Sequence, residues 1–422
     1  MNLKRYEIIK IAILTCVVLF SISMALGSLF FVRFVIFNDA DLLPNGNLMI
    51  CQYELVREES QGGIRSSDAV LIVDPAGNIV RQISAPSVPL DQPHEAYLKQ
   101  DGNILIVNCR NDTILEVDPG NEIVWKYDLR LLNWTKVNST FGPNNIVNKP
   151  SGNDWSHVND IDLRVINATT QVMLVTVRNF DMLYEINYTS ARQKSTPDES
   201  DITWYFGFPN NYTLLNHEHN ADYLPDGNII VADSENHRVI EINYTSRQIT
   251  WSTEGQLDLF WARDANLCPW NHDLVLISDS LHHRIVEFNK SSGMITWEYY
   301  GNLVQPYVAL YINETTILIS DGDNGRVFLL NRETNEITRE YDTPIGITQY
   351  ARLLSIMILI IPLADLSLKG YETIILKKKI IKREFWPSII VSIGVIGFAL
   401  YILIFPEWLL KLLVVVINAL IR

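Results

Sequence analysis

The chain has 422 residues, of which 48% are apolar and 19% are charged, and its formal net charge is −14. The charge is uneven: residues 38–350 carry 21 Lys and Arg against 43 Asp and Glu, whereas the two ends together carry 13 basic and 5 acidic residues. An acidic body argues against a nucleic-acid partner, which needs a cationic face, and basic ends favour contact with an anionic membrane surface.

The N-terminal segment is predicted to anchor the chain in a membrane. Residues 11–32 contain no charged side chain, and a helix of that length can cross about 30 Å of hydrocarbon. Three basic residues precede it, so residues 1–10 are expected in the cytoplasm. A cleaved signal peptide is the alternative, but the apolar run continues past the small residues at 25–27.

The body, residues 38–345, contains a repeating unit, and six copies can be aligned. Two clear copies read HNADYLPDGNIIVADSENHRVIEINYTSRQITW (219–251) and HEAYLKQDGNILIVNCRNDTILEVDPGNEIVW (94–125). Each copy holds four short β-rich runs separated by Gly, Asn, Asp or Pro turns. This pattern predicts an all-β fold, a six-bladed β-propeller.

Three units share an Asp and an Arg five residues apart, and their recurrence indicates scaffold ion pairs: Asp233/Arg238, Asp279/Arg284 and Asp321/Arg326. Nine Asn-x-Ser/Thr sequons in the body favour an extracellular glycoprotein: Asn111, Asn133, Asn138, Asn167, Asn187, Asn211, Asn243, Asn289 and Asn313. Outside the first predicted span only three cysteines remain, which allow at most one internal disulfide.

In a propeller the first strand of each blade lines the central channel. The residues predicted at the start of these strands are Asn38, His94, His157, His219, Arg263 and Tyr307. Asn159 follows His157 by two residues, and Arg178 is expected at the edge of the next strand of that blade. Imidazole and guanidinium groups that converge on one channel would suit an anion. The other five histidines, at 217, 237, 272, 282 and 283, are interpreted as surface or packing residues.

The C-terminal region is predicted to return to the membrane. Residues 350–368 and 386–405 are apolar enough for two further transmembrane helices, and the basic loop 369–385 between them is expected in the cytoplasm. The apolar segment 408–422 is either a short span or an interfacial helix. These assignments place the propeller on the extracellular side of the cell membrane.

Two stretches of the body resemble one enzyme family. The stretch DWSHVNDIDLRV followed by MLVTVRNFDMLYEIN (154–187) resembles the Trp-x-His-x-Asn motif, with its following Arg, of the PAPS-independent arylsulfotransferases. The segment HNADYLPDGNII is similar to a His-x-x-x-x-Leu-Pro-x-Gly-Asn segment of the same family, and DSENHRVIEI is similar to an NHL repeat.

The resemblance implies a two-step transfer of a sulfuryl group from an aryl sulfate to a phenolic or other hydroxyl acceptor. His219 would be the nucleophile that becomes sulfohistidine, and His94 and His157 would serve as acid/base or hydrogen-bonding groups. Asn159 and Arg178 would hold the sulfuryl oxygens. The remaining axial residues, Asn38, Arg263 and Tyr307, are expected to contact substrate, and neither a cofactor nor a metal is expected.

Two alternatives remain open at this point. A non-catalytic extracellular propeller could bind a protein or a glycan, and three axial histidines could hold a metal ion for lyase or lactonase chemistry. The linkers at 33–37 and about 343–350 are expected on the same face as the histidines. The channel mouth is therefore predicted to face the membrane and a lipid-borne or membrane-proximal acceptor.

Overall fold

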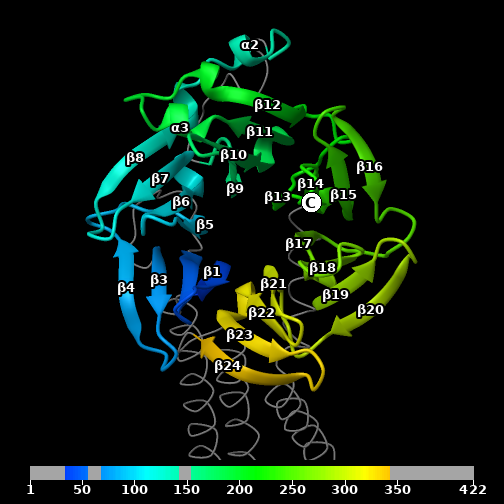
Figure 1. The fold of residues 1–422 in the computed structure, drawn as a ribbon. Helices are drawn as coiled ribbons and strands as arrows, with labels where there is room; N and C mark the ends of the chain where they lie inside the picture. The colour runs from blue at the N-terminus through cyan, green and yellow to red at the C-terminus, as the bar shows by residue number, and fades with distance from the viewer. Residues whose placement is uncertain (1–33, 56–67, 142–153, 343–422) are drawn as a thin grey trace, which may run out of the picture. The chain divides into compact units, whose positions relative to one another are not determined.

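A computed structural model describes residues 34–55, 68–141 and 154–342, which form a six-bladed β-propeller (Figure 1). The predicted all-β propeller is confirmed. The predicted spans at 11–32, 350–368 and 386–405 and the segment 408–422 lie outside these residues. Within the described ranges, no helix combines the length and the apolar character needed to cross a membrane.

Each blade is one four-stranded sheet whose strands follow one another in sequence. Blade 1 contains β1 (Phe34–Leu42), β2 (Leu48–Leu55), β3 (Ala69–Val73) and β4 (Ile79–Ser84), and blade 2 contains β5 (Pro93–Leu98), β6 (Ile104–Asn108), β7 (Thr113–Val117) and β8 (Ile123–Asp128). Blade 3 contains β9 (Val158–Asn167), β10 (Thr170–Val177), β11 (Met182–Ile186) and β12 (Ile202–Gly207), and blade 4 contains β13 (Ala221–Tyr223), β14 (Ile229–Asp233), β15 (Arg238–Asn243) and β16 (Gln248–Ser252). Blade 5 contains β17 (Ala262–Leu267), β18 (Leu274–Asp279), β19 (Arg284–Asn289) and β20 (Met294–Tyr299), and blade 6 contains β21 (Val308–Asn313), β22 (Thr316–Asp321), β23 (Arg326–Asn331) and β24 (Glu336–Asp342).

In the three ranges that the structure describes, the helical segments are single turns in the connections. They are η1 (Cys109–Asn111), η2 (Leu129–Leu131), α2 (Trp134–Val137), η4 (Arg178–Phe180), α3 (Tyr188–Ala191), η5 (Glu199–Asp201), η6 (Ser234–Asn236), η7 (Ser280–His282) and η8 (Gly322–Asn324). In blades 2 to 6, one such turn (η1, η4, η6, η7 or η8) joins the second strand to the third.

The core lies between neighbouring blades, because each sheet packs both of its faces. The second strands therefore contain apolar runs, such as Ile229–Ala232 in β14, a strand in which every residue is buried. One core cluster joins Leu174 and Leu183 of blade 3 to Ile229 and Ile240 of blade 4. The fourth strands face solvent and alternate, so β8 keeps only Trp125 and Tyr127 buried.

Blade 1 packs against blade 6 without exchanging a strand. Ser320 Oγ donates to Phe37 O at 3.2 Å, and Arg339 Nη1 donates to Gly46 O at 2.6 Å. The predicted entry linker at 33–37 is wrong from residue 34 onward, since β1 begins at Phe34. The physical reason is burial: Phe37 is completely buried in the core shared with Leu318 and Val327.

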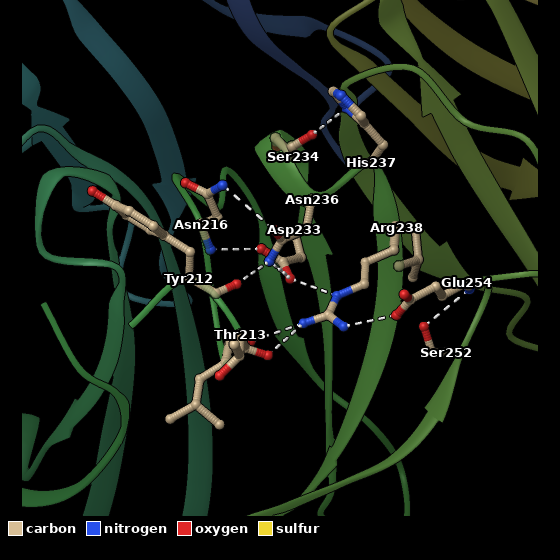
Figure 2. Close-up of polar contacts among 12 residues, drawn as sticks. Tyr212, Thr213, Asn216, Asp233, Ser234, Asn236, His237, Arg238, Ser252 and Glu254 are labelled. Carbon is tan, nitrogen blue, oxygen red and sulfur yellow. Dashed lines mark hydrogen bonds and ion pairs between the residues drawn. The ribbon is translucent and has the colours of Figure 1, made fainter. Parts of the chain in front are cut away.

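The three predicted Asp–Arg scaffold pairs are confirmed. The Arg Nε lies 2.7 Å from the Asp Oδ2 in Asp233/Arg238 and in Asp279/Arg284, and 2.9 Å in Asp321/Arg326. Figure 2 shows the first pair, in which Asp233 also accepts from Asn216 N and Arg238 also donates to Thr213 O. Each pair therefore ties the loop that enters a blade to the second and third strands of that blade.

The fold gives most of the predicted glycosylation sequons a structural role. At eight of the nine, the Asn Oδ1 accepts a hydrogen bond from a residue two or three positions later. Asn followed by Ser or Thr favours such turns. Four of these Asn end the first strand of a hairpin: Asn167, Asn243, Asn289 and Asn313. The repeated hairpins thus account for part of the clustering of sequons, and glycosylation stays a prediction.

Candidate active site

A repeated contact between blades identifies the residue that each inner strand places on the axis. In each case the side chain of the residue directly after an axial residue accepts a hydrogen bond from a backbone N–H of the following blade. The donor is the residue two positions after the axial residue of that following blade. The five contacts are Asp39 to Ala96 N (3.3 Å), Glu95 to Ile161 N (3.4 Å), Asp160 to Ala221 N (2.8 Å), Asn220 to Ala265 N (3.4 Å) and Asp264 to Ala309 N (2.8 Å).

These contacts define the axial ring as Asn38, His94, Asn159, His219, Arg263 and Tyr307, and all six line one cavity of about 230 Å³. The predicted register is therefore wrong in blade 3, where Asn159 and not His157 is the axial residue. His157 lies two residues earlier, in a left-handed turn with φ +49°. His217, two residues before His219, has φ +51°, so it occupies the equivalent place in blade 4, although the sequence pattern gave it none.

The structure nevertheless brings the three predicted histidines together. The ring centroid of His94 lies 5.9 Å from that of His157 and 6.2 Å from that of His219. Burial lowers the pKa of all three, and Arg263 lowers the pKa of His94 and His219 further. All three imidazoles are therefore neutral at pH 7, which leaves lone pairs available for nucleophilic or basic chemistry.

The tautomer of His219 follows from its hydrogen bonds. Ser234 Oγ donates its only proton to Ala262 O at 2.5 Å, because a carbonyl oxygen can only accept. The same Oγ lies 2.9 Å from His219 Nδ1, so Nδ1 carries the proton and donates to Ser234. The lone pair of His219 therefore resides on Nε2. The indole of Trp261 fixes the imidazole from the side, with ring centroids 4.8 Å apart.

Replacing Ser234 by Ala is expected to lower the turnover of His219-dependent chemistry by about 2- to 5-fold, because the neutral imidazole then populates both tautomers. The stability cost should be about 1–3 kcal/mol, since Ala fits the buried site but leaves Ala262 O without its partner. Ser280→Ala is the matched control, because Ser280 Oγ bonds a backbone carbonyl, Pro306 O, at the same place in blade 5. Equal turnover in the two variants would contradict the tautomer assignment.

His94 has two polar partners. Arg263 Nη2 lies 3.1 Å from His94 Nε2, and the backbone of Asn159 forms a second hydrogen bond with this imidazole. Arg263 is itself fixed, since its guanidinium stacks on Tyr307 at 3.5 Å and contacts Asn38 Oδ1 at 3.3 Å. The Tyr307 hydroxyl donates to Asp323 Oδ1 at 2.7 Å, which completes a preorganised cationic wall of the cavity.

Asn159 and Arg178 contribute further polar groups. Asn159 is 1% exposed, and its Nδ2 donates to Glu218 O at 2.9 Å, whereas its Oδ1 has no partner. Arg178 begins η4, and its backbone N–H donates to His157 O at 3.1 Å. The charge of Arg178 lowers the pKa of His94, His157 and His219, so its guanidinium acts on the whole site.

The donor arrangement does not favour a metal ion shared by three histidines. His94 Nε2 faces a guanidinium, and His219 Nδ1 is bonded to Ser234. In the described part of the chain, one group of possible ligand atoms lies within reach of a common ion, namely Cys109, Asp154 and His157. It contains a single histidine, and the Arg110 and Arg178 charges that lower the pKa of Asp154 would also repel a cation.

Below the axial ring the channel is lined by carboxyl groups. Burial raises the pKa of Asp264 to about 7 and those of Asp41 and Asp162 to about 6, and it also raises the pKa of Asp39, Glu95, Asp160 and Asp222. The inter-blade contacts give several of these groups a scaffold role. The part of the channel next to the axial ring is thus acidic. A substrate anion is therefore favoured at the axial ring and toward Arg178, and not among these carboxyl groups.

Replacing Asp264 by Asn should raise the free energy of unfolding at pH 8 but not at pH 5. A carboxyl group with a raised folded-state pKa stabilises the fold fully below about pH 4, and this contribution is lost as pH rises through the folded value of about 7. Asn keeps an acceptor for Ala309 N and is neutral at every pH. We expect the gain to grow by on the order of 1–3 kcal/mol between pH 5 and pH 8 in urea unfolding. A gain independent of pH would contradict this assignment.

The chain matches the models of two known families. The model of the arylsulfotransferase (ASST) family matches residues 34–214, and the NHL repeat model matches residues 221–241. The resemblance predicted from the sequence is confirmed. The ASST match contains His94, His157, Asn159 and Arg178, whereas His219 lies between the two matched ranges. No curated protein matches the chain.

Similar solved structures share little sequence with the chain. A protein of unknown function from Bacteroides caccae has a TM-score of 0.45 and 12% identity over 65% of this chain and 90% of its own. The virginiamycin B lyase of Staphylococcus aureus has a TM-score of 0.45 and 14% identity over 74% of this chain and 85% of its own. A streptogramin B lyase has a TM-score of 0.45 and 12% identity over 75% of this chain and 87% of its own.

Proposed function

We propose that the protein is an arylsulfotransferase-like enzyme that transfers a sulfuryl group through His219. In the first step His219 Nε2 attacks the sulfur of an aryl sulfate, the N–S bond forms, and the S–O bond to the phenol breaks. In the second step the hydroxyl oxygen of an acceptor attacks the sulfur and His219 is released. Such a two-step reaction follows ping-pong kinetics and needs no cofactor.

The observation that carries this proposal is the fixed tautomer of His219. The Ser234 hydroxyl, committed to Ala262 O, leaves the lone pair on Nε2, and neutrality at pH 7 keeps that lone pair unprotonated. The family match supports the reaction class.

The groups around His219 suit the transition state of sulfuryl transfer. Negative charge develops on three sulfuryl oxygens, and positioned cationic donors lower such a barrier. Arg263 and Arg178 supply guanidinium groups close enough to shift the pKa of His219. Asn159 and His94 supply further polar groups, as the resemblance implies.

The membrane placement extends the same proposal. The predicted spans at both ends and the basic loop 369–385 favour anchoring in the cell membrane, with the propeller on the extracellular side and the N-terminus in the cytoplasm. An acceptor at the membrane surface, such as a lipid-borne phenol, would then be the natural partner of an anchored enzyme.

A chromogenic assay on the full chain in detergent tests the proposal. The chain is incubated with 4-nitrophenyl sulfate and increasing phenol, with and without EDTA. We expect release of 4-nitrophenol that depends on phenol and resists EDTA. Double-reciprocal plots of the initial rate should give parallel lines. Release that EDTA abolishes would favour metal-dependent chemistry, and absence of release would favour a binding propeller.

A further inference from the structure

The turn that precedes β9 carries a carboxylate directed at one of the three histidines. His157 Nδ1 lies 2.6 Å from Asp154 Oδ1. Burial raises the pKa of Asp154, but the hydrogen bond to His157 and the charges of His157, Arg110 and Arg178 outweigh burial and hold that pKa below its ordinary value. Asp154 is therefore ionised at neutral pH, and a carboxylate can only accept, so His157 Nδ1 carries a proton.

We propose that Asp154 is a positioning residue that fixes His157 with Nδ1 protonated and Nε2 free, and that His157, rather than His94, is the general acid and base of the transfer. This assignment rests on the proposed function. His94 cannot exchange protons in the same way, because the Arg263 guanidinium contacts its Nε2 and the backbone of Asn159 forms a further hydrogen bond with the same imidazole. The division of roles between the two histidines thus follows from their partners.

The protons balance over the two steps. His157 is neutral at rest and takes up one proton from solvent at Nε2 as the aryl sulfate binds. When the S–O bond of the aryl sulfate breaks, this imidazolium gives its Nε2 proton to the departing phenolate oxygen. When the acceptor hydroxyl attacks the sulfur, its proton moves to His157 Nε2. Asp154 stays ionised throughout and stabilises the imidazolium, which is the form that must be reached in the first step.

The turn is built to hold this pair. Asp154 and His157 both adopt left-handed backbone conformations, with φ of +69° and +49°, and such strain persists only where the surroundings enforce it. Asp154 N donates to Arg110 O at 3.0 Å, and Arg178 N donates to His157 O at 3.1 Å. Between them, Ser156 N and Oγ donate to Asp112 Oδ1 at 2.7 and 2.6 Å. Loops from blades 2 and 3 therefore clamp the turn on both sides.

The dependence of the rate on the leaving group tests the assignment. A general acid matters when the departing phenol is weakly acidic and matters little when it is strongly acidic. Asp154→Asn preserves the shape, and Asn tolerates a positive φ. We expect this variant to lose about 100-fold in kcat/KM with phenyl sulfate but less than about 5-fold with 4-nitrophenyl sulfate. His94→Gln should lose activity equally with both substrates.

His282→Gln is the matched control, because His282 Nδ1 lies 2.9 Å from Asp279 Oδ2 with the same three-residue spacing, on an outer turn. It should leave both rates unchanged. Equal losses of Asp154→Asn with both substrates would show a merely structural role and overturn the assignment.

A second measurement does not depend on turnover. Nitrogen NMR of the full chain labelled with ¹⁵N-histidine identifies His157 as the signal lost in His157→Gln. We expect Nδ1 protonated and Nε2 unprotonated at pH 7, and a lower titration midpoint in Asp154→Asn because the carboxylate raises the pKa of His157. A proton on Nε2 in the wild type would overturn the proposal, whereas a chain with this tautomer but no transferase activity would refute only the proposed function.

Discussion

Replacement of His219 by Ala is expected to reduce sulfuryl transfer by about 10⁴-fold or more, because removing a nucleophile leaves no route to the covalent intermediate. The fold should persist, since the ring interacts with Ser234 and Trp261 but is not part of the inter-blade clusters. Initial rates with 4-nitrophenyl sulfate and phenol measure the loss. His272→Ala, at an exposed turn, is the control and should keep the wild-type rate. Transfer retained within 10-fold in His219→Ala would exclude the nucleophile assignment.

The largest loss of stability is expected for Asp112→Ala. This completely buried carboxylate accepts from Ser156 N and Oγ at one oxygen and from the guanidinium of Arg130 at the other. Removing it leaves buried donors unpaired, and its φ of +54° adds strain for Ala. We expect unfolding to become easier by about 3–5 kcal/mol, measured by urea denaturation.

The control for Asp112→Ala is Asp258→Ala, since the Asp258 side chain is exposed and should cost less than about 1 kcal/mol. Similar costs for the two variants would contradict the role given to Asp112. Because Asp112 holds Ser156, the same variant should also loosen the turn that carries His157.

The fold was predictable from sequence because its repeat is visible in the turns. Turns such as Pro225-Asp226-Gly227 separate the strands of each blade. The inner strands are buried on both faces, so their residues are mostly apolar and the strands can be recognised between the turns. The scaffold pairs were predictable for the same reason, since Asp233 and Arg238 recur in two further blades.

The register of blade 3 was missed because one histidine was aligned with another. A different signal was present in the sequence. The axial residue is followed by an acidic or amide residue and then by a small or branched one, as in Asn38-Asp39-Ala40, His94-Glu95-Ala96 and Asn159-Asp160-Ile161. This signal encodes the hydrogen bond to the next blade, so it marks the axial position independently of the axial side chain.

The partners of the histidines were beyond the reach of sequence patterns. Ser234 occupies the same repeat position as Ser280, which bonds only a backbone carbonyl, so nothing in its context singles it out. Asp154 is recognisable only once the left-handed turn brings its oxygen to His157. Contacts of this kind depend on backbone conformation at two or three residues, which the repeat pattern does not carry.

The measurement that decides most directly whether transfer proceeds through His219 is isolation of the sulfated protein. The full chain is incubated with an aryl [³⁵S]sulfate in the absence of acceptor, digested and mapped by mass spectrometry. We expect one labelled site, on the peptide that contains His219, and loss of this label on addition of phenol with formation of phenyl sulfate. Turnover without any labelled peptide, or a label on another residue that phenol discharges, would contradict the sulfohistidine mechanism.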